Sequence, residues 1–222
     1  EYSGNEGASW VVIASNLAAA SRTFAWDSIP YGSSPGGLWR IISEDDPTVV
    51  DQSTSLFALR NGGGLAYYVN DGSTAGDVYC SAVGNDSNGG VFPFAPKATL
   101  QSLIDSRDLE PGDIVYIDTG VYLLTASVLV GDLDAGQSTN RVVFQGSTNL
   151  AVGGTVFNRQ TTSGNALHLQ RTAGIEFRNL NIINAGQGVY SDEAGDCYFI
   201  DVRVENCSSA AFAANKSPTN YF

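Results

Sequence analysis

The chain is poor in the residues that most often carry acid–base chemistry and charge-based binding. Its 222 residues include one histidine, His168, and only 11 lysines and arginines against 23 aspartates and glutamates, which gives a net charge of −12. Such an acidic surface repels nucleic acid and anionic lipid, so we expect no nucleic-acid partner. No stretch approaches the roughly 18 apolar residues that a membrane-spanning helix needs, and we expect no membrane insertion.

Methionine is absent and cysteine is rare. The three cysteines, Cys80, Cys197 and Cys207, cannot all pair with one another, and they lack the paired C-x-x-C spacing of a metal site. We therefore interpret them as buried structural thiols. The absence of methionine, even at position 1, indicates either a processed chain or a piece of a longer one.

The sequence does contain a repeat of 22 residues near its end. Residues 166–169 align with residues 188–191 and then with residues 210–213, and Phe177 recurs as Phe199. Short alternating strands at this period, broken by Gly, Asn, Asp and Ser, are typical of the coils of a parallel β-helix. The third repeat begins without being completed, so we expect further domains of the same polypeptide on both sides of this chain.

The repeat predicts an outer stack of rings. His168, Tyr190 and Phe212 occupy the same position in successive repeats, which would place them about 4.8 Å apart across the strands. Aromatic faces bind the apolar faces of sugar rings, so these three residues are our candidates for ligand contact. Packing of the rings under a loop is the structural alternative.

Alternation along the predicted strands also gives an outward row of charge. If Leu180 and Ile182 point inward, Val202 and Val204, which lie 22 positions later, also point inward. Their neighbours Asp201, Arg203 and Glu205 then face outward together. Solvated charges on an exposed strand are the structural alternative.

Residues 1–62 follow a different pattern. Strand-like runs at residues 10–14, 22–26, 38–42 and 56–60 alternate with turn-rich segments, and all three tryptophans lie in this part of the chain. The pattern resembles part of an immunoglobulin-like or fibronectin-like β-sandwich, a module of about seven strands, so we expect an incomplete sandwich. The glycines at positions 62–64 form the predicted linker to a second domain, residues 63–222.

The second domain carries a family resemblance. Four segments that follow one another along the chain resemble the first part of bacterial right-handed parallel β-helix proteins of the pectin-lyase-like superfamily. In order, they are YYV, GNDSNGG, APKATLQSLI and PGDIVYIDTGVY. The resemblance implies an all-β fold: a right-handed parallel β-helix with an N-terminal capping helix, preceded by the partial β-sandwich. Leu100, Leu103 and Ile104 share one face at helical spacing, which predicts the helix at residues 98–107. The resemblance places this helix over the end of the first coil, with these three side chains buried. It also implies a secreted or cell-surface protein.

The superfamily includes polysaccharide lyases, glycoside hydrolases, epimerases and non-catalytic surface proteins. The resemblance therefore implies a module that binds or helps to process a polysaccharide or cell-surface glycan, without a complete catalytic site in this chain. One alternative is a structural or adhesive spacer of a surface protein, and another is a calcium-dependent polysaccharide lyase. The N-T-D, D-D, H-G and R-I-K elements of polygalacturonase-like hydrolases do not occur in the repeat region.

Candidates for lyase chemistry follow from that resemblance. Lyases of the superfamily combine acidic calcium ligands with an arginine or lysine that removes a proton, which makes Asp201, Arg203 and Glu205 weak catalytic candidates. Calcium prefers oxygen ligands, and Asp71, Asp77 and Asp86 lie in polar loops rich in such groups. Turn formation is the alternative role for these three aspartates.

Overall fold

The computed structural model describes residues 1–18, 20–28 and 30–222. The chain divides into two compact units, Glu1–Leu65 and Ala66–Phe222. No helix in the described part of the chain is long and apolar enough to cross a membrane.

The first unit contains an antiparallel sheet built around one long strand. Strand β2 (Ser34–Ile42) pairs with β1 (Tyr2–Ser3), β3 (Val50–Gln52) and β4 (Phe57–Leu59). The strands predicted within residues 38–42 and 56–60 are thus confirmed. Only one sheet is present among the described residues of this unit, so the β-sandwich stays a prediction.

Two of the predicted strands in this unit are wrong. In residues 10–14, Val11 forms an isolated bridge with Tyr2, and residues 22–26 belong to no strand. Several apolar side chains of these runs face solvent, with Val12 60% and Phe24 46% exposed. A run of β-prone residues becomes a strand only where a neighbouring strand and a buried face are available.

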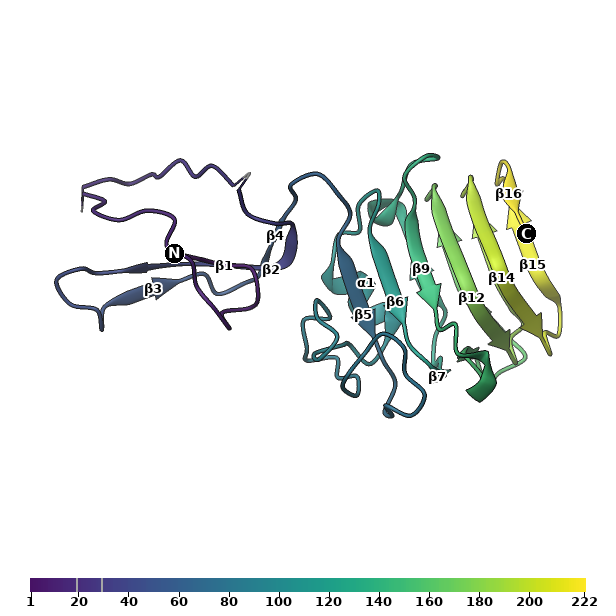
Figure 1. Cartoon of the computed structure of the whole chain (residues 1–222). Helices are drawn as coiled ribbons and strands as arrows, with labels where there is room; N and C mark the ends of the chain where they lie inside the picture. Colours follow the sequence, from purple (N-terminus) through teal and green to yellow (C-terminus); the bar gives the residue numbers. More distant parts are fainter. Residues whose placement is uncertain (19, 29) are drawn as a thin grey trace. The chain divides into compact units, whose positions relative to one another are not determined.

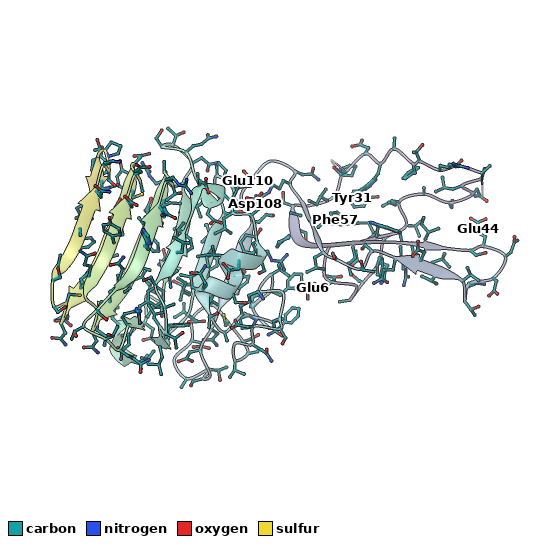
Figure 2. All side chains as sticks on the ribbon, turned by 180° about the vertical axis from the view of Figure 1, so that it is seen from behind. Glu6, Tyr31, Glu44, Phe57, Asp108 and Glu110 are labelled. Atoms are coloured by element: carbon teal, nitrogen blue, oxygen red, sulfur yellow. The ribbon has the colours of Figure 1, made fainter. Side chains whose placement is uncertain are left out.

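Aromatic side chains form the centre of the first unit. The Tyr2 ring lies 4.8 Å from Trp26, 5.6 Å from Tyr31 and 6.0 Å from Phe57, measured between ring centroids. Tyr31 and Phe57 are labelled in Figure 2. Of the three tryptophans, Trp26 joins this cluster, whereas Trp10 lies against the Arg40 guanidinium at 4.2 Å.

The second unit consists of parallel strands in two sheets that the chain visits in turn, which confirms the all-β class (Figure 1). The larger sheet contains β5 (Ala66–Val69), β6 (Ile114–Ile117), β7 (Gly120–Leu123), β9 (Val142–Gly146), β10 (Thr155–Asn158), β12 (Ile175–Ile183), β14 (Cys197–Glu205) and β16 (Asn220–Tyr221). The smaller sheet contains β8 (Val128–Val130), β11 (Asn165–Gln170), β13 (Gln187–Asp192) and β15 (Ala210–Asn215). We call one passage of the chain through both sheets a coil.

The register between coils confirms the repeat. Phe177 pairs with Phe199, 22 positions further on, and their rings stack at 5.6 Å in the core. Phe144 stacks on Phe177 at 4.7 Å, although 33 residues separate the two. The larger offset comes from an insertion in the earlier coil, where residues 147–154 form a loop that includes the 3-10 helix Leu150–Val152.

The long strands β12 and β14 each turn a corner. Asn179 (φ 52°) and Asp201 (φ 53°) adopt the left-handed conformation at that point, which Asn and Asp tolerate better than most residues. The first half of β12 pairs with β9 and its second half with β10. Beyond the corner Leu180 and Ile182 are buried, as predicted.

The predicted helix is present as α1 (Leu100–Ser106), and Leu100, Leu103 and Ile104 are buried. Thr99 caps its first turn by accepting a hydrogen bond from the Ser102 amide. Strand β8 lies at the edge of the smaller sheet, and the Gln101 side chain bonds to this edge. The Leu129 amide donates to Gln101 Oε1 at 2.7 Å, and Gln101 Nε2 donates to the Leu129 carbonyl at 3.5 Å. The helix therefore covers apolar side chains and satisfies exposed strand backbone.

The cysteines differ in burial. Cys197 is buried as predicted, whereas Cys80 and Cys207 are half-buried, and all three are free thiols. Burial raises the pKa of the Cys197 thiol to about 11, so this sulfur stays protonated near neutral pH.

We predict that Leu103→Ala lowers the free energy of unfolding by about 2–5 kcal/mol, because the Leu103 side chain is fully buried on the inner face of α1. Denaturant titration measures the change. Ser102→Ala, on the same helix but outside the buried set, is the matched control. Equal stability of the two variants would show that α1 does not anchor the first coil.

A second prediction concerns Asp134, which is 5% exposed in the 3-10 helix Asp132–Asp134. Burial raises the pKa of Asp134 to about 6, while hydrogen bonds from the Gly131 and Leu109 backbone oppose the rise. The folded state therefore binds the proton more tightly than the unfolded state, where an aspartate has a pKa of about 3.9. Stability is lost as the pH rises between these two values, because the unfolded chain loses the proton in this range while the folded state still holds it.

Asp134→Asn removes the free-energy cost of burying an ionised carboxylate at neutral pH. We expect the variant to be more stable than the parent by on the order of 1–3 kcal/mol at pH 7, with little gain below pH ~4. Melting curves at both pH values measure the effect, and Asp132→Asn, an exposed position in the same turn, is the control. A gain of the same size at pH 4 would contradict the assignment of the effect to ionisation.

Candidate functional site

The outer face of the smaller sheet carries an aromatic pair. His168 on β11 pairs with Tyr190 on β13, and the ring centroids lie 5.1 Å apart with the planes inclined by 41°. In the same register Leu129 of β8 precedes His168, and Ala213 of β15 follows Tyr190. These four side chains, Leu129, His168, Tyr190 and Ala213, form what we call the apolar row.

The predicted third ring is not part of this row. Phe212 pairs with Val189, so Ala213 lies next to Tyr190, and the offset between these coils is 23 residues. A shift of one residue turns a side chain to the opposite face of the sheet. Phe212 instead lies 5.3 Å from Phe199 and 4.3 Å from Phe222, between ring centroids.

The shift has its origin in the turn before β15. Two residues separate Asn184 from β13, whereas three residues, 207–209, separate Asn206 from β15. The Ser209 and Ala210 amides donate to the Gly186 carbonyl just as the Gly186 and Gln187 amides donate to the Gly164 carbonyl, so Ser209 already follows the 23-residue offset. The extra residue therefore lies between Asn206 and Ser209, and it displaces every later side chain of the coil by one position.

A polar row runs beside the apolar row. Gln170, Asp192 and Asn215 pair in register on the same three strands, two residues beyond His168, Tyr190 and Ala213. The separation is about 6.6 Å along the strand. Asn215 Nδ2 donates to Asp192 Oδ1 at 2.8 Å, which links two members of the row. The face thus offers ring surface next to amide and carboxylate groups.

The predicted charged row on β14 is divided by the corner. Arg203 and Glu205 form an exposed ion pair at 2.6 Å. Asp201 occupies the left-handed corner position, and within the described part of the chain no hydrogen bond or ion pair joins it to the other two. The catalytic role of Asp201, Arg203 and Glu205 stays a prediction.

The predicted calcium ligands serve as loop acceptors. Asp71 accepts from the Ser73 amide at 2.8 Å and the Val121 amide at 3.2 Å. Asp86 accepts from the backbone just before α1, at the Ala98 and Thr99 amides. Residues 1–18, 20–28 and 30–222 contain no group of three or more His, Cys, Asp or Glu side chains that could hold a metal.

Asp77 lies in a more crowded setting. Its Oδ2 atom accepts from Asn70 Nδ2 at 2.6 Å. Burial, followed by the negative charges of Asp118 and Asp71, raises the pKa of Asp77 above its ordinary value. The carboxylates of Asp71, Asp77 and Asp118 each accept hydrogen bonds from the protein.

Asp118 is a structural residue that the sequence analysis missed. It is completely buried and accepts hydrogen bonds from the backbone amides of Val78, Tyr79, Cys80 and Thr119 at 2.5–2.8 Å. One carboxylate thus fixes the long polar loop after β5. Its position directly after the apolar run Ile114–Ile117, and two residues before Gly120, was the available signal.

A cluster of charged residues on the larger sheet was also missed. Glu176 is 5% exposed and pairs with Arg178, and Arg141 Nη1 lies 4.0 Å from Glu176 Oε2. Arg141 also lies 3.5 Å from Asp196 and stacks over the Tyr198 ring at 3.8 Å. These five residues link three coils, and the charges of the two arginines and the two carboxylates cancel within the cluster.

No family model matches the chain, and no curated protein matches it. Among solved structures, the crystal structure of pectate lyase Pel9A is similar over 72% of this chain, with 16% sequence identity and a TM-score of 0.24. The chain spans about half of that protein, 53% of its length. A likeness this distant carries no inference about activity.

We predict that Arg141→Met destabilises the protein by about 1–3 kcal/mol, because it removes one of the two cations beside a buried carboxylate and the contact with Tyr198. Arg203→Met, which breaks an exposed pair, should cost at most about 1 kcal/mol. Thermal and urea unfolding compare the two variants. Equal losses would contradict a structural role for the Arg141 cluster.

Proposed function

We propose that residues 66–222 form coils of a right-handed parallel β-helix. The support is the parallel register that returns every 22 or 23 residues in the last coils. Connections between parallel strands of one sheet are right-handed in about 98% of cases, which favours that hand here.

We further propose that the outer face of the smaller sheet binds a polysaccharide chain. The observation that carries this proposal is the apolar row next to the polar row, repeated on consecutive strands of one flat face. A pyranose ring has an apolar face of C–H groups and an edge of hydroxyls. The rings of His168 and Tyr190 suit the face, and Gln170, Asp192 and Asn215 suit the hydroxyls.

An extended face also suits a chain better than a single sugar. Neighbouring strands are about 4.8 Å apart, so the apolar row crosses four strands over roughly 14 Å. A polymer lying across the strands meets the same pair of rows at each coil. A spacer module with no ligand is the competing function, and the binding experiment decides between them.

We predict that Tyr190→Ala weakens binding to polysaccharide about three- to tenfold, the effect of losing one ring contact of roughly 0.5–1.5 kcal/mol. Ala213→Tyr should strengthen binding by a similar factor, because it extends the apolar row with a third ring beside Tyr190. Affinity electrophoresis in gels that contain soluble polysaccharides measures both changes.

The matched control is Tyr68→Ala. Tyr68 stacks on Tyr116 at 5.6 Å, so the variant removes a ring of the same kind from the larger sheet. Binding that persists in Tyr190→Ala but is lost in Tyr68→Ala would move the site to that sheet. Absence of binding to any polysaccharide by the parent protein would favour the spacer.

A further inference from the structure

A shallow, open depression of about 660 Å³, which we call the groove, lies at the turns that lead into the smaller sheet. It crosses three successive coils, because its lining comes from the turns before β11, β13 and β15. The lining residues are Asn158, Gln160, Thr161, Thr162, Asn184 and Asn206. All six are uncharged, and each carries an amide or a hydroxyl group.

Several of these polar groups have unused hydrogen-bonding capacity. Asn184 Nδ2 donates to Asn158 Oδ1 at 3.0 Å, so this amide bonds toward the preceding coil. Within the described residues, the side chains of Asn206, Gln160 and Thr162 form no hydrogen bond. Exposed amides of this kind both donate to and accept from hydroxyl groups.

The wall of the groove is held in place. Ser208 Oγ donates to the Thr162 carbonyl at 2.6 Å, which ties the turn at residues 160–163 to a later coil. The Ser163 amide donates to Thr161 Oγ1, and this bond closes the turn on itself. A fixed turn that presents free amides and hydroxyls loses little conformational entropy when a ligand binds.

The charges near the groove do not favour an anionic ligand. Arg159, the cation within the same turn, donates through Nε to the Asn165 carbonyl and through Nη1 to the Leu124 carbonyl, both at 3.1 Å. At the far ends of the same strands Lys216 pairs with Glu193 at 3.2 Å. The chain as a whole has a net charge of −12, which repels polyanions. Arginine and lysine form the strongest hydrogen bonds to carboxylates, and the groove lining contains neither.

We infer that this groove is a subsite for a neutral polysaccharide, one built from sugars without carboxylate or sulfate groups. The inference rests on the binding function proposed above and names its ligand class. The groove runs along the stack of coils, as do the apolar and polar rows. It lies at the N-terminal ends of the strands that carry these rows. One chain of neutral sugars that follows the stack meets amide and hydroxyl groups in the groove at each coil.

The experiment compares neutral xylan, galactomannan and mixed-linkage β-glucan with the anionic polymers polygalacturonate and alginate, with and without calcium. Affinity electrophoresis and titration calorimetry are performed on the full chain. We expect binding to at least one neutral polymer and none to the polyuronates. Thr162→Tyr fills the groove from an exposed turn position and should weaken the neutral interaction about tenfold, a loss of roughly 1.4 kcal/mol.

The matched control is Thr74→Tyr, the same substitution at an exposed position in the loop after β5. Polyuronate binding equal to or stronger than neutral binding would overturn the inference and leave the binding function standing. Neutral binding that Thr162→Tyr does not change would show that the groove is not a subsite. Failure to bind any of the polymers would instead overturn the proposed function itself.

Discussion

The register between parallel strands is the constraint on which the second unit depends. Side chains alternate between the two faces of a strand, so each turn between strands decides which residues of the next coil reach the core and which reach the surface. Between the coils of β12 and β14 the turns match, and Phe177 lies on Phe199 while His168 lies beside Tyr190. One extra residue before β15 moves Phe212 away from the outer face and replaces it with Ala213. The composition of the candidate binding face is therefore decided in a turn outside the sheet.

The same constraint explains which parts of the structure the sequence predicts. The 22-residue repeat, the stacked phenylalanines and the helix at Leu100–Ser106 follow from periodic apolar positions, which are visible without a structure. The shift in the turn before β15 is not visible in this way, because a single inserted residue in a polar turn leaves the hydrophobic pattern acceptable in either register. In residues 1–65, β-prone runs such as residues 22–26 remain outside the sheet because pairing depends on neighbours that are distant in sequence.

Polar interactions were the least predictable part of the site. Asp118 holds four backbone amides, and Glu176 lies between two arginines, yet in the sequence both resemble ordinary polar residues. The groove could not be predicted from the repeat either. Asn158 and Asn184 are hydrogen-bonded, but 26 residues separate them, so they do not occupy equivalent positions of the 22-residue repeat. Burial and geometry assign these roles. Several acidic side chains and Arg159 are committed to the fold, and the groove presents uncharged groups to a ligand.

The central claim is that the register places a binding surface on the smaller sheet and its leading turns. The most direct test is an NMR titration of the isotope-labelled chain with a neutral oligosaccharide that the binding panel identifies. The account predicts shift changes at His168, Tyr190 and Ala213 together with residues of the groove, such as Thr162 and Asn206, while Tyr68 and Tyr116 stay unperturbed. Shift changes confined to the larger sheet around Tyr68 and Tyr116, or to the first unit, would contradict it.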